Sequence, residues 1–141
     1  MLFRSLPVLP DRARLAAMLE TLRERARTLV ELVEAGRFYF ERPRGYEPKA
    51  AEKYLTADGA RRLELLVRRL ETLEPFTAEA IEGAVRELTA QLSLKLVDLA
   101  QLARLAVTGR TASPPIFQVL ALLGREEALE RLRAARLAAA R

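Results

Sequence analysis

Residues 93–124 read SLKLVDLAQLARLAVTGRTASPPIFQVLALLG, and this stretch decides the fold. It contains two apolar runs, residues 96–107 and 116–123, whose hydrophobic positions recur with the spacing of a buried helix face. Between them lies the segment 108–115, which is rich in residue types that form turns. The pattern therefore predicts two core helices joined by a short connection.

The connection has the marks of a rigid corner. Gly109 stands where a helix can end in a left-handed residue. Ser113 and Pro114 predict a helix N-cap followed by proline at the first helical position. Arg104 precedes the corner by one turn and Arg110 lies within it, so both are candidate donors to an anion or to nucleic-acid edges.

Ile116 and Phe117 fall in the first turn of the second helix. An aromatic ring held there can stack on an unpaired base. The alternative is that these side chains only pack the two helices together. The pattern alone favours packing.

The composition permits nucleic-acid binding without requiring it. The 141 residues carry 24 basic and 19 acidic side chains, a net charge of +5, and only three of the basic residues are lysines. Arginine suits bidentate contacts to phosphates and base edges. The alternative is that a GC-rich genome favours arginine codons.

Several classes of enzyme are excluded by what the chain lacks. There is no cysteine and no histidine, which excludes disulfides, thiolate chemistry, imidazole catalysis and the usual zinc sites. No nucleotide-binding glycine motif is present. We expect Glu126 and Glu127, like Glu31 and Glu34, to lie on exposed faces, so we assign no general acid or base. We find no secretory signal and no apolar run of membrane-spanning length, and predict a cytoplasmic protein.

The rest of the chain is also predicted to be helical. From the candidate N-cap Asp11, an amphipathic pattern extends to about residue 35 and ends at Gly36. Its apolar positions predict one buried stripe, formed by Leu15, Met18, Leu19, Leu22, Ala26, Leu29, Val30 and Val33. Further helices are expected over residues 49–55, 57–73, 77–92 and 125–139. Thr56 or Asp58 begins the first of the two long helices in the middle of the chain, and Thr77 begins the second.

No segment alternates with period two, so the predicted fold is all-α with about seven helices. We expect two units, an N-terminal helical stem over residues 1–55 and a compact C-terminal bundle over residues 56–141. The loop around Gly45, between two prolines, marks the approach to this boundary.

A longer pattern supports a more specific interpretation. In order, the chain carries Leu94-Lys95-Leu96, Ala100-Gln101, Arg104, Thr108-Gly109-Arg110-Thr111, Ser113-Pro114, Ile116-Phe117 and LALLG at 120–124. This order and spacing resemble the last helical subdomain of bacterial glutamyl-tRNA synthetase, a class I aminoacyl-tRNA synthetase. In that family the corner and its flanks bind the anticodon. The resemblance runs from about Asp11 to the C-terminus but covers only the anticodon-binding third of the family's length.

The resemblance implies a set of RNA-binding residues and no cofactor. The candidates are Arg25, Arg104, Arg110, Ser113, Pro114, Ile116 and Phe117. Arg25 matches an arginine that contacts the last anticodon base and resembles the form that separates glutamate tRNA from glutamine tRNA, because a guanidinium can only donate. The alternative for Arg25 is a surface charge. The resemblance also assigns the aromatic residues 38–40 to the core beneath the junction of two subdomains.

The chain departs from the family at two places. Leu102-Ala103 follows Gln101 where the family usually has Pro-Leu, and Pro115 stands where glycine is common. Because proline has no N–H, the second change removes one possible donor to RNA.

Three functions follow from these observations. The first is a non-catalytic module that binds the anticodon loop of glutamate tRNA, either freestanding or beside a synthetase catalytic domain. The second is a helical protein-interaction domain, which predicts a large exposed apolar patch. The third is a fragment of a complete glutamate–tRNA ligase. RNA binding predicts that Arg25, Arg104 and Arg110 share one face.

Overall fold

The computed structural model describes residues 11–23 and 27–140, and within these ranges the chain forms helices, loops and no strand. This confirms the predicted all-α class. No helix in these ranges is long and apolar enough to cross a membrane. The elements are α1 (Arg12–Leu22), α2 (Leu29–Gly36), the 3-10 turn η3 (Arg37–Tyr39), α3 (Pro48–Tyr54), α4 (Ala57–Glu71), α5 (Ala78–Leu92), α6 (Leu96–Thr108), α7 (Ile116–Leu123) and α8 (Arg125–Ala139).

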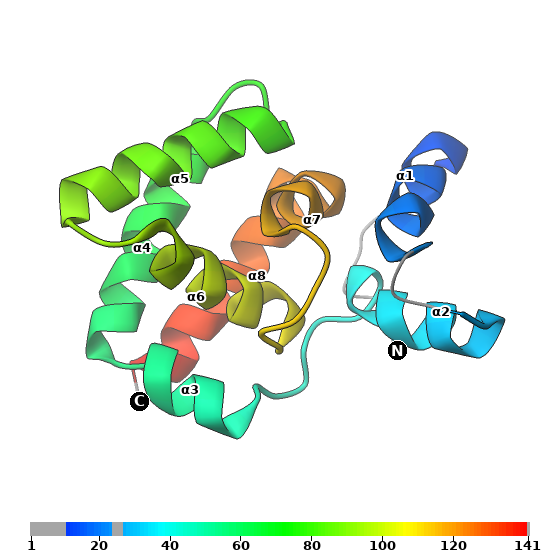
Figure 1. Cartoon of the computed structure of the whole chain (residues 1–141). Helices are drawn as coiled ribbons and strands as arrows, with labels where there is room; N and C mark the ends of the chain where they lie inside the picture. Colours follow the sequence, from blue (N-terminus) through cyan, green and yellow to red (C-terminus); the bar gives the residue numbers. More distant parts are fainter. Residues whose placement is uncertain (1–10, 24–26, 141) are drawn as a thin grey trace.

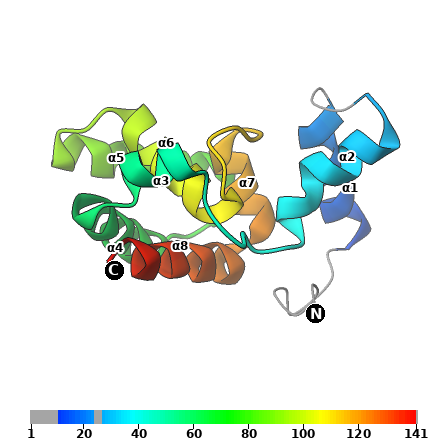
Figure 2. The ribbon, with the colours of Figure 1, turned by 90° about the horizontal axis from the view of Figure 1, so that it is seen from below.

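The helices form a bundle with a smaller lobe at one end. In the bundle, α4 and α8 lie side by side, α5 packs against α6 and α7, and α3 packs against α6 (Figures 1 and 2). The lobe consists of α1 and α2, which we call the helix pair, and η3 follows it. The bundle core is built from fully buried leucines on several helices: Leu63, Leu66, Leu70, Leu99, Leu120 and Leu132. Leu99 and Leu120 belong to the apolar runs predicted at residues 96–107 and 116–123, and the other positions lie on helices that the sequence also predicts.

Four of the described helix starts are determined locally, and three of them match residues singled out in the sequence. Asp11, Thr56 and Thr77 each occupy an N-cap position, where the side-chain oxygen accepts an N–H of the first helical turn at 2.7–3.2 Å. Such a bond satisfies a backbone donor that the helix itself leaves unpaired. The predictions at Asp11 and Thr77 are confirmed, and Thr56 is the cap at the start of α4.

The predicted single helix over residues 11–35 is wrong, because two helices occupy this range. Thr28 has an extended backbone and caps α2, its hydroxyl oxygen accepting the Glu31 N–H at 3.1 Å. The Glu31 carboxylate reaches back and accepts the Arg27 N–H at 2.8 Å. This reciprocal arrangement is close to a capping box, whose Thr-x-x-Glu pattern is present at residues 28–31. The amphipathic pattern continues across the cap and conceals the new start.

The predicted apolar stripe is also wrong over most of its length. Met18 and Leu22 are buried, but the exposed fraction is 75% for Leu29, 73% for Val30 and 56% for Val33. Leu15 and Leu19 are exposed as well. Because the chain begins a new helix at Thr28, the apolar positions of α1 and α2 do not form one continuous face. α2 instead packs toward the core through Leu32 and Ala35.

The turn after α2 brings the helix pair together. A Cβ atom added to Gly36 would lie 2.5 Å from Cδ1 of Leu22, so the end of α2 approaches α1 closely. Tyr39 is fully buried, and its hydroxyl lies 2.6 Å from the Thr21 hydroxyl of α1. Phe38 and Phe40 pack against the core from partly buried positions. The core role expected for this aromatic cluster is therefore confirmed.

Candidate nucleic-acid interface

The corner after α6 begins as the sequence predicts. Gly109 ends α6 with a φ of 79°, in the left-handed region, and its N–H donates to the Leu105 carbonyl at 2.8 Å. A Cβ atom here would lie 2.7 Å from the Gly45 carbonyl oxygen. Both the backbone conformation and this close approach require glycine. The corner therefore lies directly against the segment that connects η3 to α3.

The far side of the corner differs from the prediction, because Ser113 is not the N-cap of α7. The helix begins at Ile116, and Pro115 occupies the N-cap position with a φ of −50° and a ψ of 125°. Each proline disfavours helical backbone in the residue before it, so neither Ser113 nor Pro114 favours a helical backbone, and the helix begins beyond them. No side chain caps the start of α7.

Ser113 instead helps to hold the corner together. Arg104 Nε on α6 donates to the Ser113 hydroxyl oxygen at 2.8 Å, and a terminal nitrogen of Arg104 donates to the Gln101 side chain. The Ser113 hydroxyl donates to the Pro114 carbonyl at 2.7 Å. The structure thus brings together two predicted site residues, Arg104 and Ser113. The guanidinium bridges the two sides of the corner.

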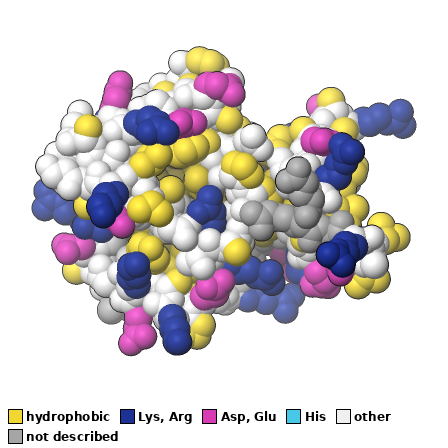
Figure 3. Space-filling view, viewed as in Figure 1, with side chains coloured by type: hydrophobic (Ala, Val, Ile, Leu, Met, Phe, Trp, Pro, Cys, Tyr) yellow, Lys and Arg dark blue, Asp and Glu magenta, His cyan; other side chains and the backbone are white. Residues whose placement is uncertain are grey.

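A groove of about 530 Å³ separates this corner from the helix pair. One wall is formed by the corner, including Arg110, Ser113 and Pro114. The other wall comes from the end of α2, from η3 and from residues 41–45. The charged lining residues are four arginines and two glutamates: Glu34, Arg37, Glu41, Arg42, Arg44 and Arg110. In the space-filling view, basic and acidic side chains gather at this junction (Figure 3).

Ion pairs offset part of the positive charge in the groove. Arg37 pairs with Glu34 at 2.6 Å and with Glu41 at 2.9 Å. The pKa of Glu34 lies below its ordinary value, chiefly because Arg37 donates a hydrogen bond to it and to a lesser extent because Arg110 is positively charged. Arg110 itself is exposed. Its charge is therefore presented to solvent at the groove wall.

The remaining predicted site residues lie elsewhere. Ile116 is 2% exposed and belongs to the hydrophobic core, as the packing alternative requires. Phe117 is partly buried against that core. Neither residue lines the groove. Arg104 does not line it either, but it stabilises the corner through its hydrogen bond to Ser113. Arg25 lies outside the described residues.

A buried ion-pair cluster lies beneath the groove, and the sequence does not predict it. Glu127 on α8 is buried rather than exposed, and it accepts hydrogen bonds from Arg42 at 2.8 and 2.9 Å and from Arg131 at 2.8 Å. Arg131 also donates to the carbonyls of Phe38 at 2.5 Å and Val107 at 2.9 Å. The cluster therefore joins α8, α6 and the segment after the helix pair. The sequence shows the i,i+4 spacing of Glu127 and Arg131, but the same spacing is common on exposed helices and so does not predict burial.

The environment of Glu127 keeps it ionised. Burial alone would raise the pKa of Glu127, but the hydrogen bonds and positive charges of Arg42 and Arg131 hold it below the ordinary value. Burial lowers the pKa of Arg131, and the bond to Glu127 opposes that shift. Glu127 is thus a structural anion rather than a general acid.

Comparison with known proteins agrees with the fold and with the proposed resemblance. A protein family described as "Anticodon binding domain" matches residues 2–136. The chain is 42% identical over 118 residues to a glutamate–tRNA ligase of Geotalea uraniireducens, covering 84% of this chain and 25% of that protein. It is 45% identical over 134 residues to glutamate–tRNA ligase 1 of Methylorubrum extorquens, covering 92% of this chain and 28% of that protein. The chain thus spans about a quarter of the length of these relatives.

A solved structure shares the same fold. The crystal structure of a glutamate tRNA ligase from Elizabethkingia meningosepticum, in complex with its amino acid, superimposes with a TM-score of 0.87 at 21% sequence identity. The match covers 96% of this chain and 27% of that one. At this identity the likeness establishes the arrangement of helices.

Proposed function

Because the chain belongs to the family of anticodon-binding domains, we propose that it is a non-catalytic module that binds the anticodon loop of a tRNA. The observation that carries the proposal is that the family matches residues 2–136, so the match includes both walls of the groove. The match is to the anticodon-binding part of the ligases alone. We propose glutamate tRNA as the ligand, because the relatives are named glutamate–tRNA ligases.

The candidate residues have different roles in this proposal. Arg110 is exposed and can donate to a phosphate or a base edge. Arg104 and Ser113 fix the conformation of the corner through their hydrogen bond. Phe117 follows the corner by two residues and is the candidate for stacking on an unpaired base. We keep Arg25 as the candidate for the last anticodon base on the strength of the family resemblance.

The proposal also includes a catalytic domain as a partner of the module. About three quarters of the length of these relatives lies outside the match. We therefore propose that the module acts with a synthetase catalytic domain, on the same chain or on another.

The division into units 1–55 and 56–141 stays a prediction.

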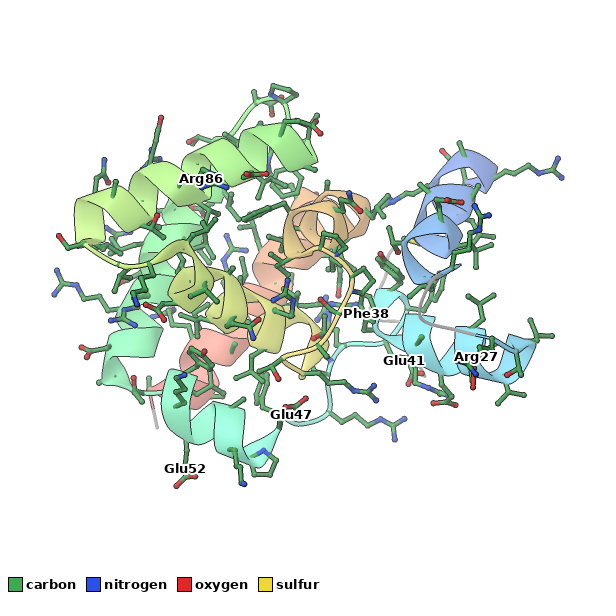
Figure 4. All side chains as sticks on the ribbon, in the orientation of Figure 1. Arg27, Phe38, Glu41, Glu47, Glu52 and Arg86 are labelled. Carbon is green, nitrogen blue, oxygen red and sulfur yellow. The ribbon has the colours of Figure 1, made fainter. Side chains whose placement is uncertain are left out.

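The test is binding of the purified chain to glutamate-specific and glutamine-specific tRNA transcripts over a salt series. We expect Arg110→Ala to weaken binding to both and to reduce the salt slope by about 1, as for a phosphate contact. Arg25→Ala should reduce the preference for glutamate tRNA. Arg86→Ala is the control, because Arg86 lies on α5, away from the groove (Figure 4). Weak, equal binding that neither substitution changes would contradict the proposal.

A second function is supported by the exposed apolar residues of the helix pair. Leu29, Val30 and Val33 are more than half exposed on α2, and Figure 3 shows hydrophobic side chains on the surface of this lobe. Exposed apolar clusters mark contacts with other proteins. Because the chain spans a quarter of its relatives, the remainder of a glutamate–tRNA ligase is the partner that we assign to this face.

Analytical ultracentrifugation tests this second function by measuring whether two proteins sediment as one complex. One protein is this chain, and the other is the Methylorubrum extorquens ligase without the segment that matches this chain. We expect salt-tolerant association that Val30→Arg abolishes, while tRNA binding by the variant is unchanged. Association that is lost at high salt, or that survives the substitution, would exclude this face as the contact.

A further inference from the structure

The corner that carries Arg110 is held in place by a residue more than sixty positions away. Glu47, which precedes α3, donates its backbone N–H to the Gly109 carbonyl at 3.0 Å. One oxygen of its carboxylate accepts the Thr111 N–H at 3.2 Å, and the other accepts the Thr111 hydroxyl at 3.1 Å. Glu47 therefore bonds to the residue before Arg110 and to the residue after it.

These contacts are not explained by the local needs of α3. Glu47 occupies the N-cap position of α3, but its side chain makes no capping hydrogen bond to that helix. Both of its carboxylate oxygens are instead engaged by Thr111. The side chain thus serves the corner rather than its own helix.

The adjoining backbone reinforces the same contact. Besides its approach to Gly45, a Cβ atom at Gly109 would lie 3.1 Å from Cβ of Pro43, so the segment 43–47 lines the corner along its length. Residues 43–45 and 108–110 both line the groove. The position of Glu47 therefore helps to set the shape of the groove wall.

We propose that Glu47 is a positioning residue for RNA binding, which fixes the backbone on both sides of Arg110 so that its guanidinium is presented to the groove. This rests on the proposed anticodon-binding function. A carboxylate beside an RNA site is electrostatically unfavourable, because it repels phosphate. Glu47 is half-buried and both its oxygens accept hydrogen bonds, which is the arrangement expected of a structural anion.

Two substitutions separate positioning from charge. Glu47→Gln removes the negative charge, but the amide can still accept from the Thr111 N–H and donate to its hydroxyl oxygen. Glu47→Ala removes the charge and both side-chain bonds. Glu52→Gln is the matched charge control, because Glu52 lies exposed on α3, the helix that Glu47 precedes, and points away from the bundle (Figure 4).

The expected results follow from these differences. Glu47→Ala should weaken binding of the glutamate tRNA transcript by about fivefold to tenfold, the loss expected for one or two hydrogen bonds. Glu47→Gln should bind within about twofold of the parent chain or more tightly. In the Arg110→Ala background, Glu47→Ala should cause little further loss, because the residue that it positions is already absent. If both Glu47 variants bind more tightly than the parent, the residue acts only through its charge and the proposal is overturned.

Amide hydrogen exchange at Thr111 gives a readout without RNA. We expect exchange to become at least several-fold faster in Glu47→Ala and to stay near the parent rate in Glu47→Gln. Unchanged exchange in Glu47→Ala would overturn the proposal whatever the binding result. If the parent chain binds neither transcript, the proposed function and the RNA role of Glu47 both fail, while faster exchange would still identify the contact with the corner.

Discussion

The substitution Glu127→Gln tests whether the buried ion-pair cluster holds the bundle and the helix pair together. Glutamine has nearly the same shape as glutamate and keeps one acceptor oxygen, so the change removes mainly the charge. Arg131 would then be left without its counter-ion at a position where its side chain is 0% exposed. Arg42 would lose the same partner from a more exposed position.

The expected loss of stability is large because the side chains of Glu127 and Arg131 are buried. Breaking a buried ion pair by removing one partner costs about 3–5 kcal/mol, since the remaining charge stays buried and uncompensated. Nη2 of Arg131 already has no hydrogen-bond partner among the described residues, so few other groups share its charge. A domain of ordinary stability, about 5–15 kcal/mol, would lose a substantial part of its margin. We expect Tm to fall by roughly 10–15 °C.

Glu82→Gln is the matched control. Glu82 and Arg86 form an ion pair at 2.9 Å with the same i,i+4 spacing on α5, but their side chains are 42% and 59% exposed. An exposed pair of this kind contributes about 0–1 kcal/mol. Urea unfolding followed by circular dichroism measures both variants against the parent chain. A loss of less than about 1 kcal/mol for Glu127→Gln, similar to that of the control, would refute the reasoning from burial.

Two further predictions concern acid stability and the corner. Because the folded-state pKa of Glu127 lies below the ordinary 4.5, its ion pairs stabilise the fold above about pH 4.5, and this contribution is lost as the pH falls through the folded-state pKa. Glu127→Gln should therefore show a shallower decline in unfolding free energy below pH 4.5, and an unchanged decline would contradict this. Gly109→Ala should cost about 1–3 kcal/mol in urea unfolding through its positive φ, with a further cost from the contact with Gly45. Gly83→Ala, where an added Cβ meets nothing within 4 Å, should instead stabilise by about 0.5–1 kcal/mol; equal effects at both glycines would argue against a special role for the corner.

Local signals in the sequence were sufficient for much of the fold. The caps at Thr56 and Thr77 and the left-handed helix end at Gly109 follow from the residue type and a few neighbours, because each is made by bonds within one turn. The apolar periodicity likewise predicted the long helices of the bundle. Where two local signals competed, the prediction failed. At Thr28 the helical periodicity hid the capping pattern, and at Ser113 the paired prolines overrode the cap.

The candidate site was predictable only in part. The corner residues Arg110, Ser113 and Pro114 were identified from sequence, and the structure places all three on one wall of the groove. The opposite wall, from α2 to residue 45, was not identified. Glu47 could not have been linked to the corner, because its partner lies 64 residues away and nothing in the local pattern requires that contact.

The sequence by itself determined the long helices of the bundle and the end of α6 at Gly109, because these depend on interactions among near neighbours. Only the tertiary structure decided that Glu127 and Arg131 are buried together and that much of the α2 apolar face remains exposed. The physical reason is that burial depends on which surfaces meet. A Glu–Arg pair four residues apart has the same pattern on a solvated helix as in a core, and the packing of distant segments determines its environment.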